Sequence, residues 1–502
     1  MQGPAKSTKS QKPTQPPANV TIIHPDLGIG GAERLIIDVA LALQNTGHKV
    51  TIYTSHRDKT HCFEEARDGT LDVRVRGDSI FPAHIAGRFH VLLAIVRQVH
   101  LAVQLLGEMG EAFCENGKGA DEVFIVDQVP ACVPLLKIFG PRAGQGQSRR
   151  QGAHGTRRGK QRILFYCHFP DQLLARRGGG LLARLVKSVY RYPFDWFEGW
   201  AMSAADRVVA NSRFTRGVVG RVFGGERLGD VRVVYPCVDT EGGTMEGEGD
   251  GEQKLWNGKK ILLSVNRFER KKDLALAIRA FHGLGGEKRR GVRLVVAGGY
   301  DPRVPENVQY HKELETLATS LGLEIATSRT VPSALSIPDS VDVLFLPSVP
   351  SAFRDTLLSQ SRLLLYTPIN EHFGIVPIEA MRAGIPVLAS NTGGPLETIV
   401  EGHTGWLRDA TDPKQWTDVI ENVLYGMSED EIERMANAAR DRVEKEFSLR
   451  AMGETLEGEI SGMLEAERRV FVGVRDIATW LSLLAVVLAV VVAVGLRAVL
   501  LG

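Results

Sequence analysis

Short apolar runs alternate with helix-like patterns along most of the chain, and turn residues separate them. Residues 19–55 read as a strand, a glycine-rich turn, a helix and a second strand, which is the order of a βαβ unit. The alternation continues with the strand candidates EVFIVDQ, RILFYCHFP, RVVANS and VRVVYPCVD. Such runs suit a parallel sheet that is buried on both faces, so the pattern predicts an α/β domain.

The same pattern starts again after residues 240–253, a stretch rich in glycine and glutamate that reads as a linker. Its strand candidates are KILLSVNRF, VRLVVAGG, VDVLFLPS, RLLLYTP and IPVLAS. We therefore predict two doubly wound α/β lobes facing a cleft, with ligands bound beyond the C-terminal ends of the strands. The predicted boundaries are 19–240 for the N-terminal lobe, 241–257 for an acidic linker and 258–467 for the C-terminal lobe.

The two ends of the chain differ from the lobes. Residues 1–18 are rich in Pro, Ser and Lys and poor in apolar residues, so we predict a disordered tail rather than a signal peptide. Residues 477–496 are uncharged and long enough to cross a bilayer, which predicts a transmembrane helix within a membrane anchor, 468–502. Three arginines precede this helix and one follows it, so the positive-inside rule keeps both lobes on the cytosolic side. A buried core helix is the alternative.

The composition of the 502 residues is that of a globular protein, with 43% apolar and 24% charged residues. The formal net charge of +2 does not indicate binding of nucleic acid by the protein as a whole. The five cysteines show neither redox nor metal-binding spacing, so we expect reduced thiols in a cytosol-facing protein. No Asp-x-Asp motif occurs, so the sequence does not indicate metal chelation of a nucleotide diphosphate. A basic segment at 141–160 and an acidic one at 241–253 read as solvated insertions.

The first glycine-rich turn, residues 28–33, is similar to a dinucleotide-binding fingerprint. Its third glycine position is occupied by Glu33, however, and no acidic residue ends the second strand to hold a ribose. An NAD-dependent oxidoreductase would explain this turn and nothing else in the chain. Gly30 and Gly31 either let a ligand approach the backbone or form a purely structural turn.

The stretch NEHFGIVPIEA places Glu371 and Glu379 eight positions apart, where a strand turns into a helix. We expect Glu371 before the helix and Glu379 in its first turn, with Gly384 at the C-terminal cap. A helix N-terminus attracts anions, above all phosphate. The alternative is that Glu379 only stabilises the helix dipole.

Two cations, Arg267 and Lys272, directly follow a strand in the same lobe. Together with a second glycine-rich turn at 391–399, they could hold a diphosphate at the C-terminal edge of the sheet. A solvated charge run is the alternative.

Several of these motifs together resemble those of the family 4 glycosyltransferases. They are GIGGAER, FYCHFPD, VVANSRFT, VVYPCVD, NRFERKKD and NEHFGIVPIEAMRAGIPVLASNTGGPLETI, and the Glu-x7-Glu element is the most diagnostic. The resemblance covers nearly all of residues 19–465. Within the family it is strongest to the dolichol-pathway branch that adds the α-1,3 and α-1,6 mannoses to the lipid-linked N-glycan precursor.

The resemblance implies two Rossmann-like lobes of the GT-B type, an acceptor side on the first lobe, GDP-mannose bound by the second, and retention of anomeric configuration. It implies no cofactor and no metal. The resemblance implies that Glu379 binds the nucleotide ribose and that Glu371 contacts the donor mannose. It implies that Arg267 and Lys272 hold the diphosphate, with backbone groups around Phe373, Gly374 and Ile375 beside the sugar and diphosphate. It also implies that His168, Gly30 and Gly31 border the reacting sugar. Of these, Glu371, His168 and Lys272 are the candidate catalytic residues.

The implied partners are a dolichyl-diphosphate-linked Man-GlcNAc2 acceptor, the endoplasmic reticulum membrane and other glycosyltransferases of the same pathway. Two alternatives stay open within this fold: a membrane-anchored N-acetylglucosaminyltransferase acting on phosphatidylinositol, and an inactive membrane scaffold. The joint presence of Arg267, Lys272 and Glu371 counts against the scaffold.

Residues 181–202 combine Trp196 and Trp200 with cations that include Lys187 and Arg191. Aromatic and basic side chains on one helix favour a membrane interface, so this segment is a candidate interfacial helix. The alternative is a packing face between helices, in which the tryptophans fill the core.

Overall fold

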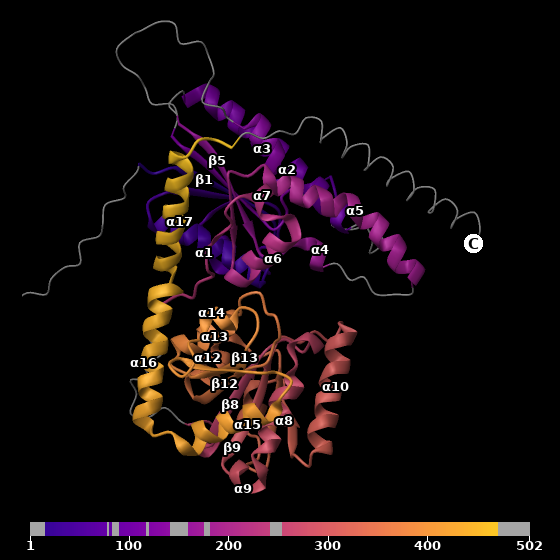
Figure 1. Cartoon of the computed structure of the whole chain (residues 1–502), viewed down its shortest axis with the longest axis vertical. Helices are drawn as coiled ribbons and strands as arrows, with labels where there is room; N and C mark the ends of the chain where they lie inside the picture. Colours follow the sequence, from indigo (N-terminus) through magenta and orange to yellow (C-terminus); the bar gives the residue numbers. More distant parts are fainter. Residues whose placement is uncertain are drawn as a thin grey trace, which may run out of the picture. The chain divides into compact units, whose positions relative to one another are not determined.

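The computed structural model describes residues 16–77, 80–82, 90–116, 120–140, 159–174, 181–240 and 254–469. The chain divides into two compact units, each built on one parallel sheet (Figure 1). The first unit holds the residues up to Asn211, Thr215–Val234 and the chain from Met452 onward, and the second holds Ser212–Phe214 and Tyr235–Ala451. The prediction of two doubly wound α/β lobes is confirmed.

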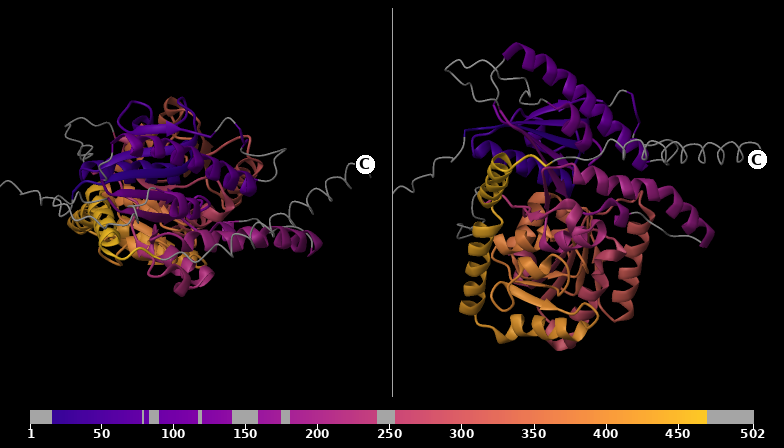
Figure 2. Two further views of the ribbon diagram at one scale, coloured as in Figure 1. Left: turned by 90° about the horizontal axis from the view of Figure 1, so that it is seen from above. Right: turned by 45° about the horizontal axis from the view of Figure 1, so that its top comes forward.

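The first unit contains a seven-stranded parallel sheet with the order β3-β2-β1-β4-β5-β6-β7. Its strands are β1 (Asn19–Leu27), β2 (Lys49–Arg57), β3 (Asp72–Val75), β4 (Glu122–Asp127), β5 (Gln161–Cys167), β6 (Arg207–Ala210) and β7 (Arg232–Val233). The helices that belong wholly or partly to this unit include α1 (Gly31–Asn45), α2 (His90–Asn116), α3 (Val133–Phe139), α4 (Asp171–Leu174), α5 (Leu181–Ser203), α6 (Arg213–Phe223), α7 (Gly225–Leu228) and α17 (Leu449–Glu465). Successive residues of β1, Ile22 and Ile23, are both fully buried, because helices cover both faces of the sheet (Figure 2).

The second unit contains a seven-stranded parallel sheet with the order β10-β11-β9-β8-β12-β13-β14. Its strands are β8 (Lys260–Val265), β9 (Val292–Gly298), β10 (Ile325–Thr327), β11 (Val343–Pro347), β12 (Ser361–Tyr366), β13 (Val387–Ser390) and β14 (Gly405–Arg408). Its helices include α8 (Leu274–Gly283), α9 (Gly285–Arg289), α10 (Pro305–Ser320), α11 (Val331–Leu335), α12 (Ser351–Ser359), α13 (Ile375–Arg382), α14 (Pro395–Thr398), α15 (Pro413–Glu421) and α16 (Glu429–Glu446). Leu262 and Leu263 of β8 enter two different apolar clusters, one on each face of the sheet.

Every strand expected from an apolar run is present, although β7 is only two residues long. Three further strands, β3, β10 and β14, have no counterpart among the expected runs. All three lie at sheet edges, where a strand is covered on one side only and its sequence is short and partly polar.

The C-terminal helix α17 belongs to the first unit from Met452 onward. Its last carbonyl groups accept hydrogen bonds from Lys160 and Arg162 at the start of β5, and cations are favourable at a helix C-terminus. The predicted C-terminal lobe, 258–467, therefore ends too late. It also begins too late, since the second unit takes up the chain again at Tyr235.

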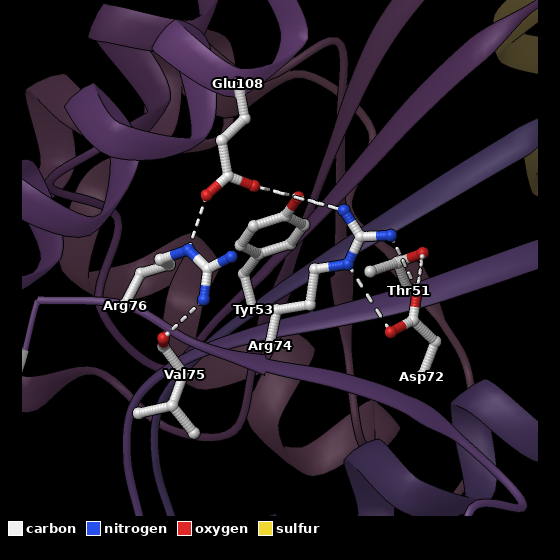
Figure 3. A network of polar contacts seen from close by, with 7 residues as sticks. All are labelled: Thr51, Tyr53, Asp72, Arg74, Val75, Arg76 and Glu108. Carbon is white, nitrogen blue, oxygen red and sulfur yellow. Dashed lines mark hydrogen bonds and ion pairs between the residues drawn. The ribbon is translucent and has the colours of Figure 1, made fainter. Parts of the chain in front are cut away.

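Within the described ranges, α2 is the one helix long and apolar enough to cross a membrane, over His90–Gly110, by length and composition only. Its side chains nevertheless contribute to the core of the first unit, where Leu101 is fully buried. Near its C-terminal end, Glu108 accepts hydrogen bonds from Tyr53 of β2 (3.0 Å) and from Arg76 beside β3 (Figure 3). These contacts make α2 a helix of the folded unit.

The candidate interfacial helix coincides with α5. Trp200 and Phe197 lie in an apolar cluster of the first unit, and Trp196 packs against it. Arg191 is 7% exposed and pairs with Asp171 (2.8 Å) and Asp195 (2.9 Å). The packing alternative therefore holds for the tryptophans, and Arg191 is not available to a leaflet surface.

Several predicted segments lie outside the described residues. These are the transmembrane helix 477–496, the tail up to residue 15, the segment 241–253 and most of the segment 141–160. They remain predictions.

Candidate active site

The second unit places its polar cluster at the topological switch point of its sheet. β8 and β12 are neighbouring parallel strands, and the chain leaves them toward β9 on one side and β13 on the other. Such divergence opens a crevice at the C-terminal edge of a sheet, where ligands bind. Lys272 lies on the loop after β8 and Glu371 on the loop after β12.

The ammonium group of Lys272 donates to a carboxylate oxygen of Glu371. The Lys272 and Glu371 side chains are 12% and 24% exposed, so the pair is partly shielded from water. Burial would raise the pKa of Glu371, but the Lys272 charge outweighs it, and the pKa lies below its usual value. Thr367 fixes the strand end beside the pair, because its hydroxyl donates to the Lys272 carbonyl (2.6 Å).

A second buried group, Tyr366 at the end of β12, lies beside Glu371. Tyr366 is 3% exposed, and burial together with the nearby Glu371 charge raises its pKa well above its usual value. Its ring lies against Gly374, where an added Cβ would come within 3.1 Å of the tyrosine oxygen. Gly374 itself has a φ of 89°, a conformation that glycine adopts at little cost.

Helix α13 begins at Ile375, directly after Gly374. Glu379 is therefore in its second turn, and the expectation that it lies in the first turn is wrong. The reason is that Pro377 occupies the third helical position instead of the first. Gly384 has a φ of 77° just after the helix, as expected for a C-terminal cap.

The two glycine-rich turns of this unit touch through their backbones. The N–H of Gly394 donates to the Glu371 carbonyl (2.8 Å), and an added Cβ at Gly393 would come within 2.5 Å of the same oxygen. The Phe373 side chain packs inward against Tyr235, with ring centroids 5.6 Å apart, which leaves its backbone at the turn.

Glu379 points one carboxylate oxygen at Arg354 of α12, 3.4 Å away. Its other oxygen, Oε2, is buried and has no hydrogen-bond partner within the described part of the chain. Burial raises the pKa of Glu379, and Arg354 opposes this effect. A buried carboxylate oxygen without a partner is costly unless a ligand supplies a donor.

Arg267 is separate from these groups in the described contacts. Its side chain is 66% exposed and pairs with Glu269 at 3.4 Å. The structure thus brings Lys272 and Glu371 into contact, whereas the exposed Arg267 side chain contacts Glu269 instead of this pair.

The first unit has its own cluster at the switch point between β1 and β4. Gly30 caps α1, and an added Cβ there would overlap the Glu33 carboxylate. His168 follows β5, and its Nε2 lies 2.6 Å from Oδ1 of Asp127, at the end of β4. The other oxygen of Asp127 lies 2.7 Å from Nδ1 of His24 on β1.

His24 and Asp127 have no exposed side-chain surface, whereas His168 is 20% exposed. Burial disfavours the charged form of His168, but the Asp127 carboxylate outweighs it and Glu33 adds to it, so the pKa of His168 is raised above its usual value. The two histidines conversely hold the pKa of Asp127 below its usual value despite burial.

Four residues of these clusters were not among the candidates predicted from the sequence: His24, Asp127, Arg354 and Tyr366. A polar residue at the end of each buried strand was the available signal, as in FIVDQ and TIIHP. Arg354 left no such signal. Within the described ranges no group of three or more His, Cys, Asp or Glu side chains is placed to hold a metal ion.

Known proteins share both the sequence and the fold. Residues 249–331 and 333–442 match the family model described as Glycosyl transferases group 1, and residues 146–242 match Glycosyltransferase Family 4. The Alpha-1,3/1,6-mannosyltransferase alg-2 of Neurospora crassa is 48% identical over 451 residues, which cover 88% of this chain and 90% of that protein. The Alpha-1,3/1,6-mannosyltransferase alg2 of Schizosaccharomyces pombe is 44% identical over 447 residues, which cover 88% of this chain and 81% of that protein.

Among solved structures, the sucrose-phosphate synthase of Thermosynechococcus elongatus matches with a TM-score of 0.60 at 16% identity, covering 90% of this chain and 100% of that one. This likeness shows the fold alone, which is of the GT-B type.

Proposed function

Since the chain belongs to the family of α-1,3/1,6-mannosyltransferases, we propose that it transfers mannose from GDP-mannose to a dolichyl-diphosphate-linked Man-GlcNAc2 acceptor. The product is an N-glycan precursor with α-1,3- and α-1,6-linked mannose, formed with retention of configuration. The names of the relatives favour mannose over N-acetylglucosamine as the sugar.

The observation that carries this proposal is the Lys272–Glu371 pair beside the start of α13. A nucleotide-sugar donor leaves behind a diphosphate, whose growing negative charge needs a cation and N–H donors. Lys272 supplies the cation, and the backbone around Phe373, Gly374 and Ile375 supplies the helix N-terminus. Arg267 extends from the same strand end to the diphosphate.

The two glutamates read hydroxyl groups of the donor. Glu371 is held by Lys272, so its remaining acceptor capacity serves the mannose. Glu379 has a buried oxygen that the ribose hydroxyls of GDP satisfy. In the first unit, His168 with Gly30 and Gly31 borders the reacting sugar.

The leaving-group charge is met by Lys272, Arg267 and backbone N–H groups, without a metal or other cofactor. We also propose that residues 477–496 anchor the protein in the endoplasmic reticulum membrane with both units on the cytosolic face. Other glycosyltransferases of the dolichol pathway are the proposed neighbours in that membrane.

The test uses membranes that contain the full-length protein. They are incubated with radiolabelled GDP-mannose and a synthetic Man-GlcNAc2 diphosphate lipid, with UDP-N-acetylglucosamine and phosphatidylinositol in a parallel reaction. We expect labelled lipids extended by one and two mannoses, unchanged by a chelator. Labelled phosphatidylinositol, or no labelled product with GDP-mannose, would overturn the proposal.

A further inference from the structure

The three side chains His24, Asp127 and His168 form one hydrogen-bonded chain that runs from the core of the first unit to its surface. They come from three neighbouring strands: His24 lies within β1, Asp127 ends β4 and His168 directly follows β5. The contacts are 2.7 Å between His24 and Asp127 and 2.6 Å between Asp127 and His168. Only His168 is exposed, so only His168 can touch a ligand.

We propose that Asp127 and His24 are positioning residues that hold His168 as an imidazolium, with its Nδ1–H directed at an oxygen of the substrate. This inference rests on the proposed mannosyl transfer. Because Asp127 fixes Nε2, the ring nitrogen that remains for a ligand is Nδ1.

Asp127 cannot itself take part in proton transfer with a substrate. Both of its oxygens are bonded to histidines, and its side chain has no exposed surface. Its contribution is electrostatic: a carboxylate beside an imidazole stabilises the protonated ring and orients it.

His24 is the buried end of the chain. Its Nδ1 donates to Asp127, while its Nε2 is buried and meets no hydrogen-bond partner within the described part of the chain. His168 is the ring that solvent reaches, so the proton that the Asp127 carboxylate favours resides at the exposed end.

The titratable groups around His168 come from five elements. Asp127 lies on β4, Glu33 on α1, His24 on β1 and Tyr166 on β5, and the ring centroid of Tyr166 is 5.3 Å from that of His168. Glu198 of α5 accepts hydrogen bonds from the N–H groups of Asp171 (2.7 Å) and Gln172 (3.3 Å), at the start of α4. Protonation of Glu198 would weaken these two hydrogen bonds as the pH falls, whereas His168 loses its proton as the pH rises.

Glu198 thus affects the acid limb of the pH profile and His168 the alkaline limb. The experiment measures kcat and KM for mannosyl transfer by the full-length enzyme between pH 5.5 and 9. In Asp127→Asn the carboxylate charge is lost, so the pKa of His168 falls. The alkaline limb of kcat should move to lower pH by about one to three units. At neutral pH kcat should fall by about tenfold to a hundredfold with KM for GDP-mannose little changed.

The matched control is Asp206→Asn. Asp206 is a buried acid of the same unit, paired with Lys137 at the opposite edge of the sheet. It should lower the melting temperature without moving the alkaline limb. If Asp127→Asn behaves like Asp206→Asn while the wild type transfers mannose, the positioning role is wrong; if the wild type transfers no mannose, the proposed function has failed instead.

A second pair of variants covers the case in which Asp127→Asn does not fold. His24→Asn keeps an N–H donor for Asp127 and should retain kcat close to the wild-type value. His24→Leu removes that donor and should lower kcat, although His24 has no surface that a substrate could touch. Equal kcat in both variants would overturn the inference.

Discussion

Lys272→Ala tests the proposed diphosphate site most directly. The Lys272 ammonium is 12% exposed and bound to Glu371, so the substitution removes a cation from a partly shielded site. Removing one preorganised donor from a site of developing negative charge costs about 3 to 4 kcal/mol of transition-state stabilisation. That corresponds to a loss of kcat of about a hundredfold to a thousandfold. Arg267→Ala should lose about a hundredfold for the same reason.

A second effect of Lys272→Ala follows from its partner. Without Lys272, the effect of burial on Glu371 is opposed only by the weaker charges of His372 and Lys271, so the pKa of Glu371 rises relative to the wild type. The ionised form of Glu371 is then lost at a higher pH as the pH falls, so the variant should also be more sensitive to acid. Loss of the Lys272–Glu371 hydrogen bond should cost about 1 kcal/mol of folding stability.

The assay is mannosyl transfer at saturating GDP-mannose, with thermal unfolding recorded on the same samples. Lys271→Ala is the matched control, because Lys271 is the adjacent residue, is 66% exposed and pairs with Glu269. It should leave kcat within about twofold of the wild type, as expected for an exposed ion pair. Near-normal turnover of a folded Lys272→Ala protein would refute the assignment of the diphosphate to this site.

Three further predictions follow from the same structure. Glu379→Gln should chiefly raise KM for GDP-mannose, since ribose contacts are the same in the ground state and the transition state. Glu371→Gln should chiefly lower kcat, since the mannose contact tightens in the transition state. The reverse pattern in steady-state kinetics would mean that the two roles are exchanged. Arg354→Met removes the cation that counters the raised pKa of Glu379, so the loss of donor affinity on acidification should begin at a higher pH in binding titrations; an unmoved acid limb would exclude this role. Burial raises the pKa of Glu198 to about 7, so the contribution of Glu198 to stability is present below about pH 4.5 and is lost as the pH rises to 7. Relative to Glu198→Gln, the wild type should lose about 3 kcal/mol of unfolding free energy over that range. If the unfolding free energies from urea denaturation changed with pH in parallel for the two proteins, this prediction would be wrong.

The fold was accessible from the sequence because central parallel strands are apolar on both faces. Runs such as KILLSV and VRLVVAG are stable as central strands of a sheet that helices cover on both faces, and they form β8 and β9. The edge strand β3, with the sequence DVRV, lacks this signal because two of its four residues are charged. Likewise, the return of α17 to the first unit depends on contacts between residues far apart in the sequence, such as the hydrogen bond of His48 with Glu457 across 409 positions, which no local pattern encodes.

The site residues also fall into two groups: some are close together in the sequence, and others are distant in the sequence but in contact in the structure. Glu371, Gly374 and Glu379 belong to one short strand-to-helix segment, so their spacing alone predicted that they act together. His24 and Asp127 are 103 positions apart, and each reads alone as a polar residue ending a buried strand. Their contact arises because the sheet order places β1 beside β4 and β4 beside β5, which brings three strand ends to one edge. The sequence alone shows which polar residues lie near the end of each strand. The order of the strands in the sheet decides which of these residues can form a hydrogen bond with one another.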